Sequence, residues 1–264
     1  MTLRIDMIMN KIEDTLQTLY FLEANSRQKL WINEIHPLSK LLTCIAYVGI
    51  VVSFPKYAFF PLLTMCCYPL LIMTLARLSF KACLYQLRIL FVLVGMVGIF
   101  NPLFDRVLLF RIGPLSVTTG MLSLLTLMLK GIFSVLSSYL LLATTSIEEI
   151  CFALKRLHLP NSFICILLLS YRHFILFLSE LNQMLEAYHL RAVHQKGIHL
   201  KAWGSFTGHF LLRSIDRAHA IFESMTLRGF HGYLTLTPHY KSSSINLLYP
   251  FIWLTLFLML RFLL

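Results

Sequence analysis

The stretch that decides the fold is residues 115–145, LSVTTGMLSLLTLMLKGIFSVLSSYLLLATT, in which Lys130 is the only charged side chain. A helix needs about 20 apolar residues to cross the roughly 30 Å hydrocarbon core of a bilayer. The stretch therefore predicts membrane-spanning structure. Its length fits one tilted helix or two short helices joined near Gly131, and the sequence leaves both arrangements open.

Further uncharged runs lie on both sides of this stretch. They cover residues 41–55, preceded by 37–40, then 57–76, 89–104 and 245–260. Hydrophobic residues make up 58% of the chain and charged residues 13%, against about 25% charged in soluble domains. The mean hydropathy is +0.74. This composition excludes an ordinary soluble enzyme, and we expect an all-α membrane protein with about five transmembrane helices.

Positive charge sets the predicted orientation. The chain has 23 Lys and Arg against 12 Asp and Glu, which gives a net charge of +11. Before the first run and between later runs there are five, one, three, two and ten Lys or Arg. Loops rich in these residues stay on the cytoplasmic side, so we interpret the excess as topology and not as nucleic-acid binding. The prediction is a cytoplasmic N-terminal segment 1–37, transmembrane helices 1–4 in 38–145, a helical cytoplasmic coupling domain 146–243 and a last transmembrane helix 244–264.

The clearest amphipathic segment of the coupling domain is 206–225. Its apolar positions repeat in alternating steps of four and three and form one stripe: Leu211, Ile215, Ala218, Phe222 and Met225. Another side of this helix carries three basic side chains, Arg213, Arg217 and Arg228. Gly229 is a suitable stop for the helix. The basic side either meets a partner or is a solvated surface, and both interpretations fit the pattern.

Sequence patterns typical of catalysis are missing. The chain has no Gly-x4-Gly-Lys-Ser/Thr loop for nucleotide phosphates and no Gly-x-Ser-x-Gly nucleophile turn. His189, His194 and His199 lie five residues apart, which is about 140° of helical rotation, so a regular helix cannot turn all three toward one ion. We expect no catalytic residues, no metal site and no cofactor. Any ATP-driven function then requires another subunit.

Five short motifs follow one another along the chain. They are His36-Pro37-Leu38-Ser39-Lys40, Thr144-Thr145-Ser146 followed by residues 147–160, Leu169-Ser170-Tyr171-Arg172, Arg213-Ser214-Ile215-Asp216-Arg217-Ala218, and Met225-Thr226-Leu227-Arg228-Gly229-Phe230. In this order they resemble the transmembrane T components of energy-coupling factor (ECF) transporters, most closely the CbiQ cobalt transport group. The resemblance covers about residues 30 to 235.

The resemblance implies a membrane scaffold that contacts a substrate-binding membrane S component and two ATP-binding cassette ATPases. In the family, two short arginine motifs end long coupling helices and dock into the ATPases. Here they map onto Leu190-Arg191-Ala192 and Leu227-Arg228-Gly229. Both have Leu before the arginine, and the first also has Ala after it, so the second is closer to the family pattern.

The residues that we expect to support the coupling helix are Arg213, Ile215, Arg217 and Phe222. The predicted function is mechanical coupling, without catalysis, in a multi-pass protein of the bacterial inner membrane. Cobalt or nickel is the expected cargo. A T component that serves a vitamin such as biotin is the alternative within this class. A membrane-embedded enzyme that uses the cytoplasmic histidines is the alternative from another class.

Overall fold

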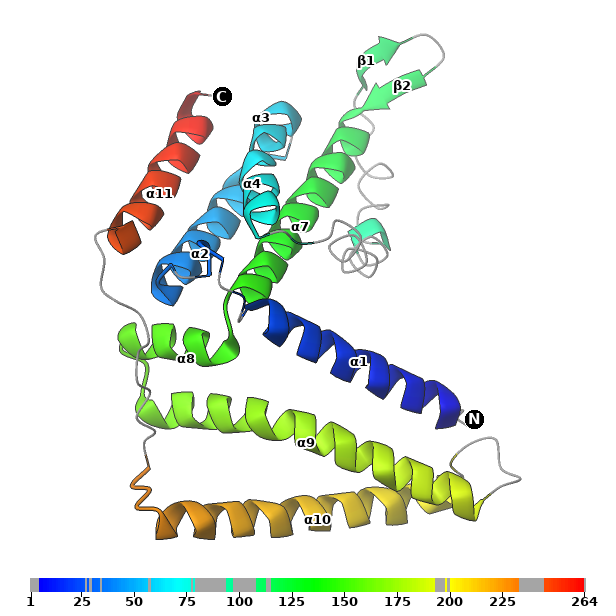
Figure 1. Ribbon diagram of the computed structural model, residues 1–264. Coiled ribbons are helices and arrows are strands. Elements are labelled where there is room, and N and C mark those ends of the chain that lie inside the picture. Colours follow the sequence, from blue (N-terminus) through cyan, green and yellow to red (C-terminus); the bar gives the residue numbers. More distant parts are fainter. Residues whose placement is uncertain are drawn as a thin grey trace. The chain divides into compact units, whose positions relative to one another are not determined.

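The computed structural model is built from helices and one small hairpin of strands (Figure 1). The residues that it describes are 5–26, 28, 30–33, 35–56, 58–76, 78, 94–96, 108–112, 115–192, 198, 200–232 and 245–263. The helices are α1 (Ile5–Ser26), α2 (Pro37–Ser53), α3 (Phe59–Thr64), α4 (Cys67–Leu75), α7 (Thr119–Thr144), α8 (Ile147–Arg156), α9 (Asn161–Arg191), α10 (Leu200–Leu227) and α11 (Ile245–Leu263). The strands are β1 (Leu108–Ile112) and β2 (Leu115–Thr118). The helical fold class is confirmed, whereas the hairpin was not predicted.

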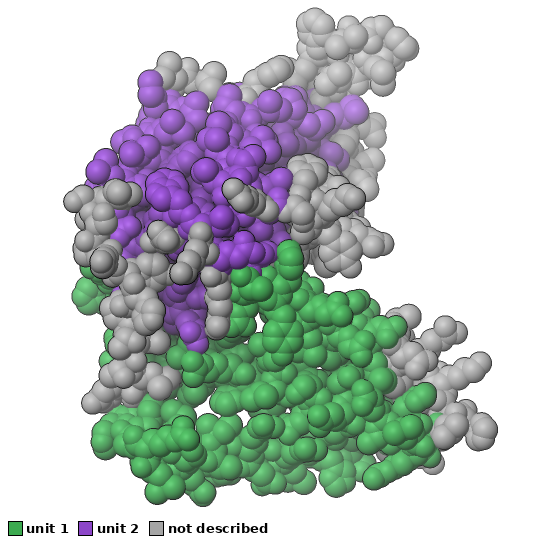
Figure 2. All heavy atoms as spheres, viewed as in Figure 1, with its two compact units in different colours: residues 1–24, 154–238 green, residues 25–153, 239–264 purple. Residues whose placement is uncertain are grey.

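The chain divides into two compact units (Figure 2). Unit 1 consists of residues 1–24 and 154–238, and unit 2 of residues 25–153 and 239–264. Unit 2 therefore contains α2, α3, α4, α7 and α11. Unit 1 contains α9 and α10 together with nearly all of α1, so the N-terminal segment is grouped with these two long helices.

Helix α2 lies in unit 2 between α7, which runs antiparallel to it, and α11, which runs parallel to it (Figure 1). Polar groups at the start of α2 form hydrogen bonds with both neighbouring helices. The Lys40 ammonium donates to the carbonyl of Thr144 at 3.0 Å, and the His36 backbone N–H donates to Asn246 Oδ1 at 3.2 Å. The first turn of α2 is thus joined to the last turn of α7 and the first turn of α11.

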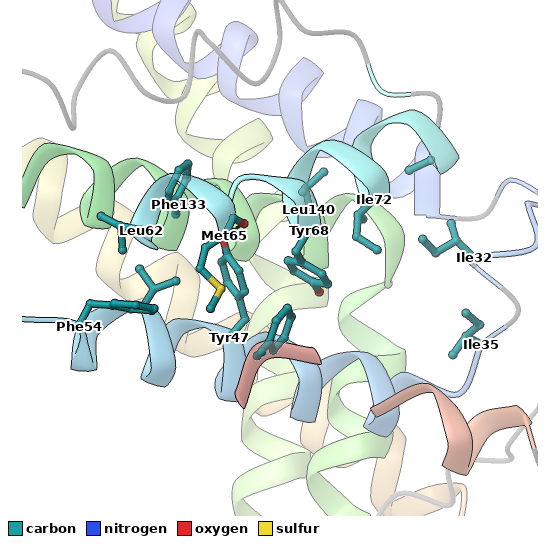
Figure 3. Packing of buried hydrophobic residues seen from close by; sticks show 13 residues of the cluster. Ile32, Ile35, Tyr47, Phe54, Leu62, Met65, Tyr68, Ile72, Phe133 and Leu140 are labelled. Carbon is teal, nitrogen blue, oxygen red and sulfur yellow. Dashed lines mark hydrogen bonds between the residues drawn. The ribbon is translucent and has the colours of Figure 1, made fainter. Parts of the chain in front are cut away.

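Aromatic rings fill the centre of unit 2 (Figure 3). The ring of Tyr47 lies 4.7 Å from that of Tyr68 and 5.2 Å from that of Phe257, centroid to centroid. Tyr47 is fully buried, and its hydroxyl donates to the carbonyl of Met65 at 2.9 Å. A buried hydroxyl that is hydrogen-bonded avoids the cost of losing water, so this ring joins α2 to the turn after α3 at little penalty.

The predicted second run, residues 57–76, is not one continuous helix. It forms α3 and α4, because the backbone N–H groups of Met65 and Cys66 bond three residues back, to Leu62 and Leu63, in a turn between the two helices. Such a three-residue pattern is typical of a tightened helix end. The predicted third run, residues 89–104, lies outside the described residues except for 94–96.

One long helix, α7, covers residues 119–144 of the 115–145 run, which decides between the two arrangements that the sequence left open. Residues 115–118 are not part of the helix, since they form β2 and pair antiparallel with β1. Lys130 lies within α7, and its ammonium donates to the carbonyls of Val52 and Phe54 at 3.1 and 2.6 Å. The last carbonyls of a helix have no partner within it, so this lysine satisfies the end of α2.

Two of the described helices are long and apolar enough to cross a membrane, namely α7 and α9. Shorter apolar helices cover residues 37–53, 61–75 and 248–262. The α7 segment lies within the predicted transmembrane region. The α9 segment lies within the region that the charge pattern assigned to the cytoplasm, and its Leu-rich first half is what gives it this apolar character.

Candidate functional site

Helices α9 and α10 form an antiparallel pair in unit 1 (Figure 1). The rings of Phe177 and Phe210 meet edge to face at 6.2 Å near the middle of the pair. Further along α9, Leu185 packs with Ile198 and with Ile12 of α1, all three buried. Because α1 covers this end, the pair is held there by a three-helix core.

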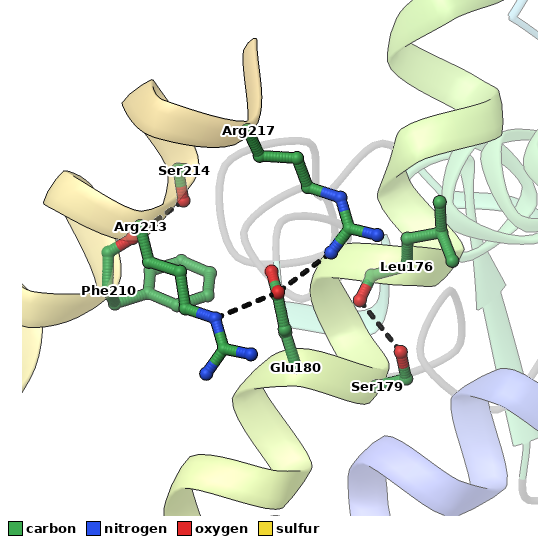
Figure 4. A network of polar contacts seen from close by, with 7 residues as sticks. All are labelled: Leu176, Ser179, Glu180, Phe210, Arg213, Ser214 and Arg217. Carbon is green, nitrogen blue, oxygen red and sulfur yellow. Dashed lines mark hydrogen bonds and ion pairs between the residues drawn. The ribbon is translucent and has the colours of Figure 1, made fainter. Parts of the chain in front are cut away.

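A shared ion pair fastens the middle of the two helices (Figure 4). The Oε1 atom of Glu180 on α9 accepts from Arg217 Nη1 at 2.7 Å and lies 3.0 Å from Arg213 Nε. The Glu180 side chain is 9% exposed, against 36% for Arg217 and 55% for Arg213. A buried carboxylate needs partners of opposite charge, and these two arginines supply them.

Arg213 and Arg217 were both predicted to support the coupling helix, and the structure shows what they contact. They lie four residues apart, so they share one side of α10 and reach the same acceptor. Sequence reasoning missed Glu180. The available signal was the position of Glu180, the first of two carboxylates in α9, directly after the apolar run of that helix. The register of α9 against α10 cannot be read from the sequence.

The end of α10 has a well-formed glycine stop. The N–H of Phe230 donates to the carbonyl of Met225, and the N–H of Gly229 donates to that of Thr226, both at 3.0 Å. Gly229 has φ of +80°, a conformation that residues with a Cβ adopt at a cost. These two bonds are the Schellman pattern of a helix end, so the predicted stop is confirmed. Arg228 is the residue just before this glycine and is exposed.

The other predicted arginine, Arg191, is the last residue of α9 and is also exposed. Among the described residues, neither Arg191 nor Arg228 has an ion-pair partner. Since the helices are antiparallel, Arg191 and Arg228 lie at opposite ends of the pair. Arg191 is 11 residues beyond Glu180, and Arg228 is 11 residues beyond Arg217, so at a rise of about 1.5 Å per residue the two arginines are roughly 33 Å apart along the pair.

Only the last part of the predicted apolar stripe of α10 reaches the α9 contact. Leu211, Ile215 and Phe222 are 60%, 44% and 60% exposed. The side of α10 that faces α9 includes Phe210 and Arg217 instead. Each of these residues precedes a stripe residue by one position, so the contact side is rotated by about 100° from the stripe. Ile215 and Phe222, both expected to support the coupling helix, are therefore accessible in unit 1.

An apolar groove of about 350 Å³ runs between α9 and α10 on the Arg228 side of the ion pair. Its lining residues from α9 are Leu169, Ser170, His173 and Phe177, and from α10 and its end Ala218, Ile221, Phe222, Met225 and Phe230. The Nδ1 atom of His173 is buried and has no hydrogen-bond partner among the described residues. The packing of the two helices is thus looser here than at the α1 end.

Two motifs that are about 100 residues apart in the sequence meet in unit 2. Lys40, 5% exposed, donates to the carbonyls of Asn33 and Thr144. Ser146 and Glu149 form a capping box at the start of α8, in which each side chain accepts from the other's backbone N–H, at 3.3 and 3.0 Å. The first turn of α2 is therefore bonded to the segment that leads into α8.

The histidines do not form a described metal site. His189 lies at the end of α9, while His194 and His199 fall outside the described residues. Within the part of the chain that the structure describes, no three His, Cys, Asp or Glu side chains are grouped so that they could hold a metal ion.

The comparisons with known proteins identify one family. A comparison with curated proteins gives no significant match. The family model for the cobalt transport protein CbiQ matches residues 28–240. This range covers most of both units, including the paired helices and the lysine that joins α2 to α7. The family is a membrane component of cobalt transport, and the chain belongs to this CbiQ family of cobalt transport proteins.

Proposed function

We propose that this chain is the coupling T subunit of an ECF-type importer in the bacterial inner membrane. It binds two ATP-binding cassette ATPases and a substrate-binding membrane S component, and it transmits movement from the ATPases to the S component. The proposed cargo is cobalt, which the family description names, or nickel, and a vitamin such as biotin is the alternative.

The observation that carries the proposal is the position of the two arginines. Arg191 and Arg228 are exposed, have no ion-pair partner within the described chain, and end two long helices that run in opposite directions. A guanidinium keeps its charge and can form two parallel hydrogen bonds with a carboxylate or with carbonyls. A separation of roughly 33 Å suits two separate docking sites, one on each ATPase.

Unit 1 has an exposed apolar surface that suits a membrane partner. Along the first half of α9, Phe163, Ile166 and Phe174 are 48%, 64% and 47% exposed. Large exposed apolar side chains in a row are typical of an interaction surface. We assign this surface to the S component, which accounts for the apolar character of a helix on the cytoplasmic side.

The test is charge reversal at the ends of the helices. Arg228→Glu is expected to abolish uptake and the co-purification of an ATPase, while Arg191→Glu weakens both. Removing one partner of a buried, hydrogen-bonded charge pair at an interface costs about 2–5 kcal/mol, and reversal adds repulsion. The matched control is Lys155→Glu, which reverses an exposed basic residue on α8.

Uptake of radiolabelled cobalt, nickel and biotin is measured in cells that express each variant with its native partners. Lys155→Glu is expected to transport normally. Normal uptake by Arg228→Glu at wild-type expression would refute the docking role, and uptake of biotin alone would select the vitamin alternative.

A further inference from the structure

The contact between α9 and α10 has a tight end and a loose end. At the tight end, Ile12, Leu185 and Ile198 are 7%, 2% and 1% exposed. At the loose end, the 350 Å³ groove separates the first half of α9 from the last turns of α10. Well-packed interfaces resist deformation, so any relative movement of the two helices is easiest where the packing is incomplete.

The ion pair of Glu180 lies between these two ends. Along α9, Glu180 follows the groove residue Phe177 and precedes the core residue Leu185. Along α10, Arg213 and Arg217 precede the groove residue Ala218. The ion pair is therefore the last polar connection between the helices before the groove begins.

The geometry of Glu180 suits a connection that tolerates rotation. Its Oε1 atom contacts both arginines, while its Oε2 atom is buried and has no partner among the described residues. A guanidinium and a carboxylate bind best through two parallel bonds that use both oxygens. A small rotation of α10 can give either Arg213 or Arg217 such a two-bond contact, so the carboxylate stays paired in each position.

We propose that Glu180 is a positioning residue for Arg228, the fulcrum about which the last turns of α10 close on and open from α9. Arg228 lies 11 residues beyond Arg217, which is about 16 Å along the helix. Closing the groove moves the Arg228 end, while the core around Leu185 keeps the other end fixed. The inference rests on the proposed function, because this movement matters for transport only if Arg228 docks to an ATPase.

Distances between spin-labelled non-natural residues test the proposal, so that the native cysteines remain in place. One pair, at Ser162 and Glu223, reports on the loose end, and a second, at Ala187 and Thr207, reports on the tight end; all four positions are exposed. In the full chain in nanodiscs, the distance distribution at the loose end is expected to be about twofold wider than at the tight end.

Glu180→Gln is expected to widen the loose-end distribution about twofold further and to leave the tight end unchanged. The matched control is Glu186→Gln, the same change at an exposed carboxylate of α9, which should alter neither pair. Glu180→Asp keeps the charge, so its loose-end distance distribution should stay narrower than that of Glu180→Gln. If Glu180→Gln changes neither distribution, or widens both equally, the fulcrum is overturned.

The assembled transporter separates a positioning role from a structural one. Adding Mg-ATP is expected to shift the mean distance of the loose-end pair in wild type and Glu186→Gln. In Glu180→Gln the shift is expected to be lost although both ATPases remain bound. If ATPases never co-purify with the wild type, the proposed function fails. The spin-label distance distributions measured on the chain without ATPases still test the fulcrum in that case. A shift that persists in Glu180→Gln overturns the fulcrum and leaves the proposed function standing.

Discussion

Removing the two arginines that contact Glu180, singly and together, should reveal how much the shared ion pair stabilises the fold. Arg213 is 55% exposed, so Arg213→Ala is expected to cost about 1 kcal/mol or less, as for a surface pair. Arg217 is more buried and forms the shorter contact, so Arg217→Ala is expected to cost about 1–2 kcal/mol. In either single variant the carboxylate keeps one cationic partner.

The double variant leaves Glu180 buried without a cation, which costs about 3–5 kcal/mol. The double loss should therefore exceed the sum of the single losses, because only the last arginine to be removed exposes the full penalty. For a chain of this size, 1 kcal/mol corresponds to about 2–4 °C in Tm, so we expect the double variant to melt about 6–20 °C lower.

The assay is thermal unfolding of the purified chain in detergent, followed by intrinsic fluorescence. Adding Glu180→Gln to the double variant provides the control, since a neutral amide needs no cation and most of the lost stability should return. A double variant whose loss equals the sum of two small single losses would refute the reasoning. It would mean that water solvates the carboxylate and that the ion pair contributes little to stability.

Two further predictions concern residues that end helices. Gly229→Ala should lower the free energy of unfolding by about 1–2 kcal/mol, because φ at this position is +80°. The cost comes from the backbone alone, since nothing lies within 4 Å of an added Cβ. Gly208 lies inside α10 and also has nothing within 4 Å of an added Cβ, so Gly208→Ala should instead stabilise the fold by about 0.5–1 kcal/mol. Tm shifts of the same sign in the two glycine variants would contradict this prediction. Lys130→Met removes the bonds to the carbonyls of Val52 and Phe54 and should cost about 1.5–3 kcal/mol, measured as a lower Tm at unchanged membrane insertion.

Much of the fold could be predicted because apolar runs without charges are a strong signal for helices. Residues 119–144 and 245–263 are helical as the runs indicate. The first four residues of the 115–145 run are uncharged like nearly all of the rest, so the absence of charge could not show that they pair with β1. The break near Met65 had a local signal, since Pro69 has no N–H to bond the carbonyl of Met65 four residues back, as a continuous helix would require.

The candidate site was predictable only where its cause is local. Gly229 could be identified as a stop because a left-handed residue at a helix end favours glycine. The partners of Lys40, Lys130 and Arg217 could not be identified, since each contact depends on how two distant segments are aligned. The same limit applies to the apolar stripe through Ile215. The sequence shows that these apolar side chains share one side of α10, but it cannot show which element they contact.

The bonds at the start of α2 also bear on how such a chain could be assembled from interchangeable parts. Thr144 lies ten residues before the long second segment of unit 1 and Asn246 eight residues after it, and both are bonded within residues 36–40. The two flanks of this segment are thus anchored at one corner of the same unit. Domains whose ends lie close together are tolerated as insertions and can be exchanged without reopening the host fold. Unit 2 could therefore keep its own packing when the residues between Thr144 and Asn246 are exchanged for those of a relative.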